Sequence, residues 1–341
     1  MAPATGGRST STTSADLAAG LTAFVGRELG APATIEGLRR LPGGASREIW
    51  LFTLARDGAA PARLVLRRDP PGHVIESSRQ QEFELLRSAK VAGVPVPQVR
   101  WCGGGDPVVG SSFFIMDFVE GETIGRKILR DAALAPARAV LPEQLAQAAA
   151  RIHTMDPGAL GPRVPDGATS GSAELARYTQ ILHDLAPDSH PALELAIRWL
   201  GTRMPAPRRT VVVHGDYRIG NVIVGPEGLR AVIDWELTHV GDPMEDLGWL
   251  CVRSWRFGID DQPVGGLCER ARLFAAYERA SGFPVDPAAV RWWEVFGNLK
   301  WGVICIMQAQ TFLNGVKNVE LAALGRRIVE MELELLDLTE M

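Results

Sequence analysis

His214-Gly215-Asp216-Tyr217-Arg218-Ile219-Gly220-Asn221 is the stretch that decides the fold, and Ile233-Asp234-Trp235-Glu236 follows it after one predicted hairpin. A valine strand ends at His214, a loop carries Asp216, and Asn221 opens the next strand. A Gly/Pro turn then predicts a return strand. That return strand brings Asp234 back beside Asn221. Two carboxylates and one amide are therefore expected to converge.

This set of side chains is typical of one kind of chemistry. Carboxylate and amide oxygens are ligands that suit Mg²⁺, which keeps waters and substrate phosphates at its other positions. Phosphoryl transfer needs such a metal and a further carboxylate that orients the attacking hydroxyl and accepts its proton. The sequence predicts Asp216 as that base, with Asn221 and Asp234 as the metal ligands.

The rest of the chain predicts an α+β fold in two lobes. We expect a tail over 1–14, an N-terminal nucleotide-binding lobe with a leading helix over 15–120, and a helical C-terminal lobe with the catalytic loop over 121–341. In the first lobe, apolar runs separated by turns predict an antiparallel meander with strands over 34–41, 48–54 and 63–68. A helix over about 76–92 follows, and helical periodicity dominates after Pro142.

The ordered motif His-Gly-Asp, four residues, Asn, then Ile-Asp-Trp resembles the catalytic signature of the aminoglycoside phosphotransferase and choline kinase-like superfamily. These proteins are relatives of protein kinases. The resemblance runs from about Leu41 to at least Gly248 and implies a bilobal protein-kinase-like fold, with a small antiparallel-sheet N-lobe and a mainly helical C-lobe. It also implies a crevice between the lobes.

The resemblance assigns nucleotide-binding residues in the first lobe. Gly43 and Gly44 lie between two strands, where small residues let backbone amides approach phosphates, and Ser46 would supply the hydroxyl nearest the terminal phosphate. Val65 and Arg67 share one face of a strand, with Val65 toward the adenine and Arg67 toward the α and β phosphates. Arg67 departs from the usual Lys; it keeps the charge but not the compact shape of an ammonium.

Three more residues are expected to serve the nucleotide. Glu82, on the helix that follows, is the candidate ion-pair partner of Arg67. Asp117 and Val119 lie in the segment that would link the lobes, where the Asp117 carbonyl and the Val119 amide would meet the adenine edge. In the second lobe, His153 is expected to be a buried polar strut and Asp246 to brace the catalytic loop through backbone hydrogen bonds.

The acceptor side offers weaker signals. Most of the tryptophans after Leu247 are expected to be core residues, but Arg253 and Arg256 flank Trp255 and could recognise a carboxylate or phosphate. The overall pattern looks closest to the kinase-like domain associated with acyl-CoA dehydrogenases, which implies a hydroxylated acid or acyl metabolite as acceptor. A solvated surface arginine pair is the alternative interpretation of the two residues.

Composition excludes several classes of protein. The net charge of -4 disfavours a nucleic-acid partner, and no window of 18 apolar residues predicts a membrane span. The first residues lack the apolar centre of a secretory signal, so we expect a cytoplasmic protein, monomeric or homodimeric. The four cysteines are widely spaced and are expected to be reduced and mostly buried.

The resulting expectation is a kinase that transfers the γ-phosphoryl group of ATP, or GTP, to the hydroxyl of a small-molecule alcohol with the help of Mg²⁺. Two alternatives stay open. The first is an aminoglycoside or macrolide phosphotransferase. The second is a nucleotide-binding pseudokinase with a regulatory role, which Arg67 favours and the complete set Asp216, Asn221 and Asp234 disfavours.

Overall fold

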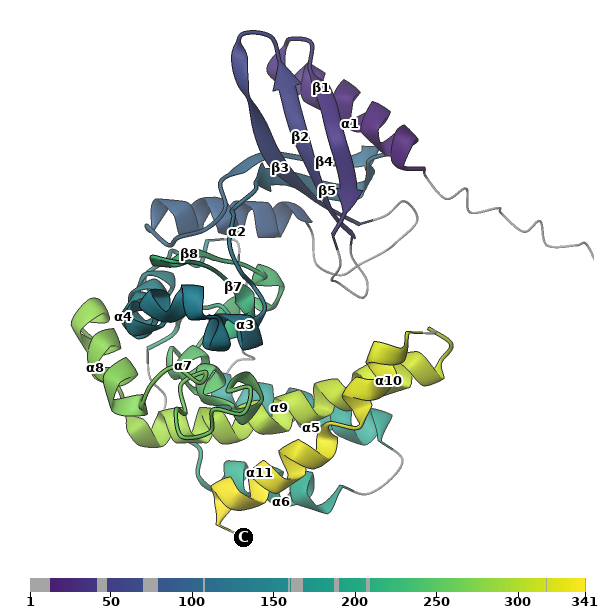
Figure 1. Ribbon diagram of the computed structural model, residues 1–341. Helices are drawn as coiled ribbons and strands as arrows, with labels where there is room; N and C mark the ends of the chain where they lie inside the picture. Colours follow the sequence, from purple (N-terminus) through teal and green to yellow (C-terminus); the bar gives the residue numbers. More distant parts are fainter. Residues whose placement is uncertain are drawn as a thin grey trace, which may run out of the picture. The chain divides into compact units, whose positions relative to one another are not determined.

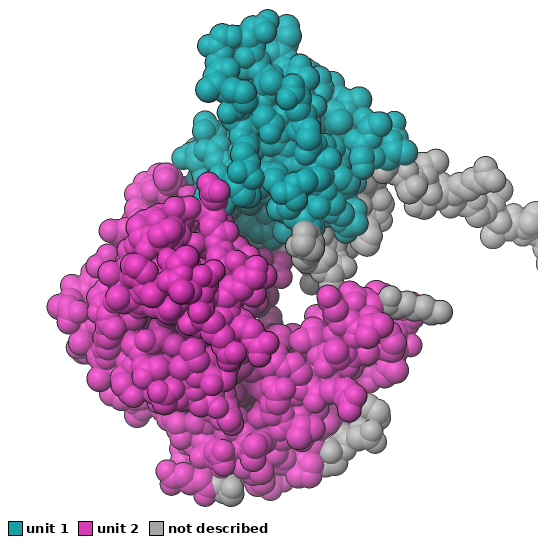
Figure 2. All heavy atoms as spheres, in the orientation of Figure 1, with its two compact units in different colours: residues 1–87, 97–119 teal, residues 88–96, 120–341 magenta. Residues whose placement is uncertain are grey.

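The computed structural model describes most of the chain, namely residues 13–41, 48–69, 79–106, 108–158, 160, 168–186, 190–206, 209–316 and 318–340. The chain divides into two compact units, which Figure 2 shows in different colours. Unit 1 is Met1–Arg87 with Pro97–Val119, and unit 2 is Ser88–Val96 with Glu120–Met341. The segment 88–96 thus belongs to the second unit, although the sequence placed it in the first lobe.

Unit 1 is built on an antiparallel sheet. Its elements are α1 (Ser14–Leu29), β1 (Thr34–Arg40), β2 (Glu48–Arg56), β3 (Ala59–Asp69), the first part of α2 (Arg79–Val91), β4 (Val99–Asp106) and β5 (Gly110–Asp117). The strand order is β1-β2-β3-β5-β4 (Figure 1). The predicted meander β1-β2-β3 is confirmed. Strand β4 was not predicted, because its run of three glycines is atypical of a strand.

Helix α1 and the sheet form the core of unit 1. The core consists of Leu17, Leu21, Phe24, Val25, Phe52, Leu54, Leu64, Leu66, Val109, Phe113 and Ile115. Because side chains alternate along a strand, the inward Leu64 and Leu66 turn Val65 and Arg67 to the opposite face. Thr13 caps α1 in a capping box with Asp16.

Unit 2 is mostly helical. Its elements are α3 (Gly125–Arg130), η1 (Ala132–Leu134), α4 (Ala135–Ile152), α5 (Ser170–Leu185), α6 (Pro191–Thr202), β6 (Val211–Val213), η2 (Ile219–Asn221), β7 (Val222–Gly225), β8 (Gly228–Val232), η3 (Trp235–Leu237), β9 (His239–Gly241), α7 (Met244–Cys251), η4 (Arg253–Trp255), α8 (Arg270–Ser281), α9 (Pro287–Leu313), α10 (Val319–Gly325) and α11 (Ile328–Thr339). The predicted α+β class, with a small sheet and a mainly helical remainder, is confirmed.

Helix α9 is the centre of unit 2. Most of its residues between Ala289 and Ile306 are buried, since α5, α6, α7, α10 and α11 pack around it (Figure 1). A helix with apolar residues on most of its circumference needs such cover, and its buried Glu294 and Lys300 have polar partners. Beside it, β7 and β8 form the predicted hairpin, but β6 pairs with β9 instead of joining them. The three short strands expected here therefore belong to two separate ribbons.

Candidate active site

The loop after β6 is shaped by His214 and Gly215. Nδ1 of His214 accepts the backbone N–H of Asp216 at 3.2 Å, and Nε2 lies 3.1 Å from the carbonyl oxygen of Ile233, which is the pattern of a neutral ring protonated at Nε2. Gly215 has a φ of 78°. A Cβ there would lie 2.5 Å from the carbonyl oxygen of Leu237. Only glycine therefore fits this turn.

Asp246 holds this loop through hydrogen bonds to its backbone. Its carboxylate accepts the backbone N–H groups of His214 at 2.8 Å and Gly215 at 2.9 Å, and it lies 3.1 Å from Nε2 of His153. Burial alone would raise the pKa of Asp246, but the hydrogen bonds from His153 and His214 hold it below its usual value. The predicted bracing role of Asp246 and the predicted strut role of His153, which also bonds Tyr277, are confirmed.

The carboxylate of Asp216 is held by donors on both oxygens. Oδ1 accepts Nε1–H of Trp249 at 2.7 Å and Nε–H of Arg218 at 3.0 Å, and Oδ2 accepts Nδ2–H of Asn221. The expected meeting of Asp216 with Asn221 is thus present. Trp249 is one of the tryptophans after Leu247, most of which were expected to be core residues, because an indole on a helix carries no local signal that its N–H meets a carboxylate.

Asn221 and Asp234 lie at the same end of the β7–β8 hairpin. Val222 pairs with Val232, and the backbone N–H of Ile233 donates to the carbonyl of Asn221 at 2.9 Å. Asp234 then takes a left-handed conformation, with φ 70° and ψ 61°. Because the amide nitrogen of Asn221 donates to Asp216, the amide oxygen is the atom that a cation could bind. The donor set of one amide and one carboxylate fits Mg²⁺.

Within the described part of the chain, no group of three or more His, Cys, Asp or Glu side chains could hold a metal ion by itself. A site of one amide and one carboxylate leaves the other coordination positions to waters and phosphates, which is how proteins commonly bind Mg²⁺.

A buried ammonium lies beneath the loop. Nζ of Lys300 donates to the carbonyl of Gly215 at 2.9 Å, lies 3.6 Å from Glu245, and lies 4.7 Å from the ring centre of Trp249. Burial lowers the pKa of Lys300, but Tyr178 and Glu245 more than offset this and raise it above its usual value. Lys300 was not predicted as a site residue; its signal in the sequence is a single charge in the largely apolar stretch 295–306.

The predicted ion pair of unit 1 is present. Nη1 of Arg67 lies 2.6 Å from Oε1 of Glu82, and both side chains are buried. The pair is part of a larger network that the sequence did not predict, because Arg79 also bonds Glu82 and lies 3.3 Å from Asp69. Four alternating charges are therefore fixed together on β3 and α2.

Of the other residues predicted to bind the nucleotide, the structure describes some and leaves others outside the described residues. Val65 is buried in β3 opposite Met116. The carboxylate of Asp117 forms two hydrogen bonds with Arg100, at 2.7 and 2.8 Å, which leaves the proposed role to its backbone carbonyl. Val119 is the last residue of unit 1. Gly43, Gly44 and Ser46 lie outside the described residues.

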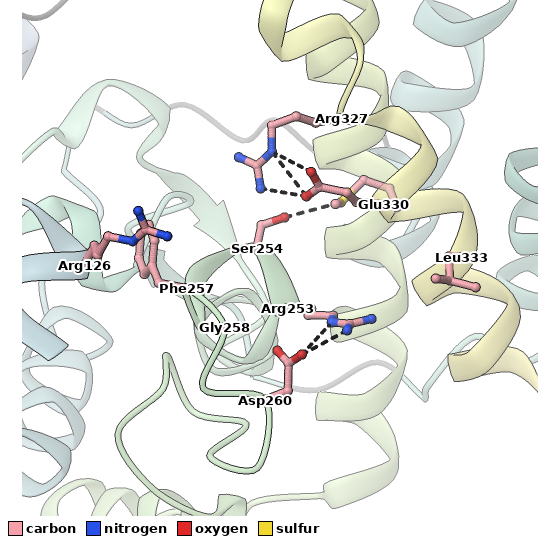
Figure 3. Close-up of a pocket in the computed structure, with 10 residues that line it drawn as sticks. Arg126, Arg253, Ser254, Phe257, Gly258, Asp260, Arg327, Glu330 and Leu333 are labelled. Carbon is pink, nitrogen blue, oxygen red and sulfur yellow. Dashed lines mark hydrogen bonds and ion pairs between the residues drawn. The ribbon is translucent and has the colours of Figure 1, made fainter. Parts of the chain in front are cut away.

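The two arginines expected to face the acceptor have different surroundings. Arg253 lines a cavity of about 630 Å³, shown in Figure 3, where it pairs with Asp260. Arg256 is buried and donates to Glu294 and to the carbonyl of Cys251, and it is not among the residues that line this cavity. The prediction that Arg256 faces the acceptor is therefore wrong, because a buried carboxylate holds its guanidinium in the interior, and Arg253 stays a prediction.

Arg253 has arginine neighbours that are distant in sequence. The residues lining the cavity are Arg126, Arg253, Ser254, Phe257, Gly258, Asp260, Arg327, Glu330, Met331 and Leu333. Arg327 bonds Glu330, whereas Arg126 has no hydrogen bond or ion pair with any residue that the structure describes. Ser254, which lines the cavity, precedes Trp255 in η4, and the Arg218 guanidinium of the loop lies 4.6 Å from the ring centre of Trp255.

A kinase-like fold with this loop defines a class of protein, the phosphotransferases. The chain belongs to the phosphotransferase enzyme family, whose model matches residues 37–291. Solved structures share the fold. A protein of Ralstonia eutropha JMP134 that is assigned as an aminoglycoside phosphotransferase aligns with a TM-score of 0.73 at 23% identity, over 94% of this chain and 98% of that one. The aminoglycoside phosphotransferase APH(4)-Ia, complexed with AMP-PNP and hygromycin B, aligns with a TM-score of 0.62 at 16% identity, over 92% and 97%.

Curated relatives are longer proteins. Acyl-CoA dehydrogenase family member 10 of Mus musculus is 31% identical over 57% of this chain, and family member 11 of Rattus norvegicus is 30% identical over 67%. This chain spans 18% and 31% of their respective lengths. The resemblance to the aminoglycoside phosphotransferase family and to the domain associated with acyl-CoA dehydrogenases is confirmed. Among the described helices, none is both long and apolar enough to cross a membrane.

Proposed function

We propose that this chain transfers the γ-phosphoryl group of ATP to a hydroxyl group of a small anionic acceptor. The observation that supports this proposal most directly is the carboxylate of Asp216. Trp249, Arg218 and Asn221 hold it by hydrogen bonds in the loop after β6. In this position Asp216 orients the attacking hydroxyl and accepts its proton. Catalysis of a loose phosphoryl transfer rests mainly on such alignment and on charge neutralisation.

Asn221 and Asp234 would hold Mg²⁺, which neutralises charge on the phosphates when bound. In unit 1, Arg67 grips the α and β phosphates, and Glu82 holds its guanidinium in place. Val65 packs against the adenine, while the Asp117 carbonyl and the Val119 amide meet its edge. The complex of APH(4)-Ia with AMP-PNP supports ATP rather than GTP as donor.

The charge of the cavity favours an anionic acceptor. Arg126, Arg253 and Arg327 carry three positive charges against the two negative charges of Asp260 and Glu330. A polycationic aminoglycoside would meet net repulsion there, whereas a carboxylate or phosphate could pair with Arg126. A hydroxy acid or a hydroxyacyl thioester of coenzyme A carries such a group. The relatedness to acyl-CoA dehydrogenase family members supports the same class of acceptor.

The reaction is tested by incubating the purified chain with Mg²⁺ and ATP labelled in the γ-phosphoryl group. The panel contains hydroxy acids, their coenzyme A thioesters, neutral diols of equal length, and kanamycin. We expect label in the anionic acceptors. Asp216→Asn and Asp234→Ala should lower turnover by about 10³-fold or more, whereas exposed Asp337→Asn should not. Nucleotide binding with no transfer to any acceptor would overturn the proposal in favour of a pseudokinase.

The acceptor class has its own matched pair of variants. Arg126→Gln should raise KM for the anionic acceptor about 10-fold, because one charge-assisted contact is lost. Arg326→Gln makes the same change at an exposed arginine that does not line the cavity, and it should leave KM unchanged. Equal KM values for the Arg126 variant and the wild type, or preferred phosphorylation of kanamycin, would contradict the anionic assignment.

A further inference from the structure

Trp249 stands in an unusual relationship to the proposed base. It is 3% exposed, yet its indole N–H is directed at Oδ1 of Asp216, 2.7 Å away. A hydrogen bond to a charged acceptor is among the stronger ones, and the buried indole N–H finds its partner in this carboxylate. The contact therefore constrains the carboxylate as much as it constrains the ring.

The hydrogen bonds of Asp216 leave one acceptor position. A carboxylate has about four lone-pair sites, two on each oxygen. On Oδ1 they are taken by Trp249 and Arg218, and on Oδ2 one is taken by Asn221. Among the described residues, no other side chain bonds this carboxylate. The remaining site, on Oδ2, is the one that an acceptor hydroxyl can use.

We propose that Trp249 is a positioning residue that fixes the rotation of the Asp216 carboxylate, so that Oδ2 presents its open lone pair to the acceptor hydroxyl. This inference rests on the proposed function, in which Asp216 accepts the proton. Trp249 itself does not touch the acceptor.

Helix α7 fixes both the backbone and the side chain of the loop. Asp246 and Trp249 are three residues apart, so they share one face of the helix. Asp246 holds the backbone N–H groups of His214 and Gly215, and Trp249 holds the next residue's carboxylate. One rigid element thus sets two points of the catalytic loop.

The indole of Trp249 lies against Lys300 and Gly297 of α9. The ammonium of Lys300 lies 4.7 Å from the ring centre of Trp249 and donates to the carbonyl of Gly215, so it ties the ring to the loop that the ring orients. A Cβ on Gly297 would lie 3.2 Å from Cε3 of Trp249. The lack of a side chain at 297 therefore allows the ring to lie close against α9.

The test compares two tryptophan variants. Trp249→Phe keeps an aromatic ring and removes the N–H. Trp292→Phe makes the same change at a buried indole that donates to the carbonyl of Leu200 at 3.0 Å, away from Asp216. We expect Trp249→Phe to lower kcat about 10-fold or more, since misalignment acts on the chemical step, with KM for ATP unchanged. Trp292→Phe should keep kcat. Equal effects of the two variants on kcat would reduce Trp249 to a packing residue and overturn the inference.

A spectroscopic measurement tests the contact even if Trp249→Phe does not fold. In ¹H–¹⁵N spectra, Asp216→Asn should move one indole resonance upfield, because a charged acceptor becomes neutral. The same resonance should be missing from Trp249→Phe. No change in any indole resonance of Asp216→Asn would overturn the inference. Undiminished turnover of Asp216→Asn would instead overturn the proposed function, so the two failures are distinguishable.

Discussion

The carboxylate of Asp246 accepts the backbone N–H of Gly215 at 2.9 Å, and neither residue is exposed. The loop that carries the proposed base is therefore held by a side chain 31 positions away, in the interior of unit 2. Charged hydrogen bonds to buried backbone groups are costly to remove, because the donors then have no partner.

Asp246→Asn should lower the free energy of unfolding by about 3 kcal/mol. An amide has one acceptor oxygen and presents donors on its other side, so at least one backbone N–H of the loop loses its partner. Asp337→Asn is the matched control at an exposed position and should change stability by less than about 0.5 kcal/mol. Urea denaturation of both variants measures the difference, and equal stabilities would show that the loop does not depend on this carboxylate.

Glu82→Gln should destabilise unit 1 by about 3 kcal/mol, since the buried guanidinium groups of Arg67 and Arg79 lose a shared counter-charge. Glu84→Gln makes the same change two residues further along α2, where the pair with Arg87 is more than half exposed. An exposed pair contributes little, so this control should stay within about 0.5 kcal/mol of the wild type. Thermal unfolding of the two variants measures the difference. Similar losses of stability in both would mean that burial of the network has no energetic consequence.

His239 should make stability depend on pH. Its two ring nitrogens lie 2.9 Å from the Leu237 carbonyl and 3.1 Å from Glu245, so both meet acceptors and favour the doubly protonated ring. Burial lowers the pKa of His239, but Glu245 more than offsets it and raises the pKa above its usual value. Conversely, although burial alone would raise the pKa of Glu245, His239 and Lys300 hold it below its usual value.

Proton linkage gives the direction in which the free energy of unfolding changes with pH. A raised histidine pKa contributes stability that is complete below the unfolded value of about 6.5 and is lost as pH rises through the folded value. The free energy of unfolding should therefore fall as pH rises above about 6.5, and His239→Gln should remove this part of the slope. Chemical denaturation between about pH 6 and pH 9 measures it. A slope that is unchanged in the variant would contradict the assignment.

Gly248→Ala should separate α7 from α9. The added Cβ would lie 2.6 Å from Cβ of Trp293 and 2.9 Å from the backbone nitrogen of Glu294, so the backbone itself must shift. We expect a loss of about 2 kcal/mol, typical of overpacking. Gly201→Ala, in the exposed last turn of α6 with nothing within 4 Å, should instead gain about 0.5 kcal/mol. We expect the melting temperature to fall in Gly248→Ala and to rise in Gly201→Ala. A higher melting temperature for Gly248→Ala than for the wild type would contradict the prediction.

The parts of the site that sequence predicts well are those joined by short stretches of chain. Asp216, Asn221 and Asp234 lie within one loop and one hairpin, so strand and turn signals place Asn221 and Asp234 together. Arg67 and Glu82 are found through the alternation of β3 and the helix that follows it. Trp249 and Lys300 escaped prediction, because their roles depend on contacts between helices that local periodicity does not specify.

Sequence alone determined the β1-β2-β3 meander, the β7–β8 hairpin, the catalytic motif and the charge balance, since turns, strand alternation and helical period are local properties of the chain. Tertiary structure alone decided that Arg256 turns inward to Glu294 while Arg253 lines a cavity, and that one indole and one ammonium hold the loop. The reason is physical: a buried charge or N–H takes its partner from whatever packing brings within hydrogen-bond reach, and packing joins residues far apart in the chain.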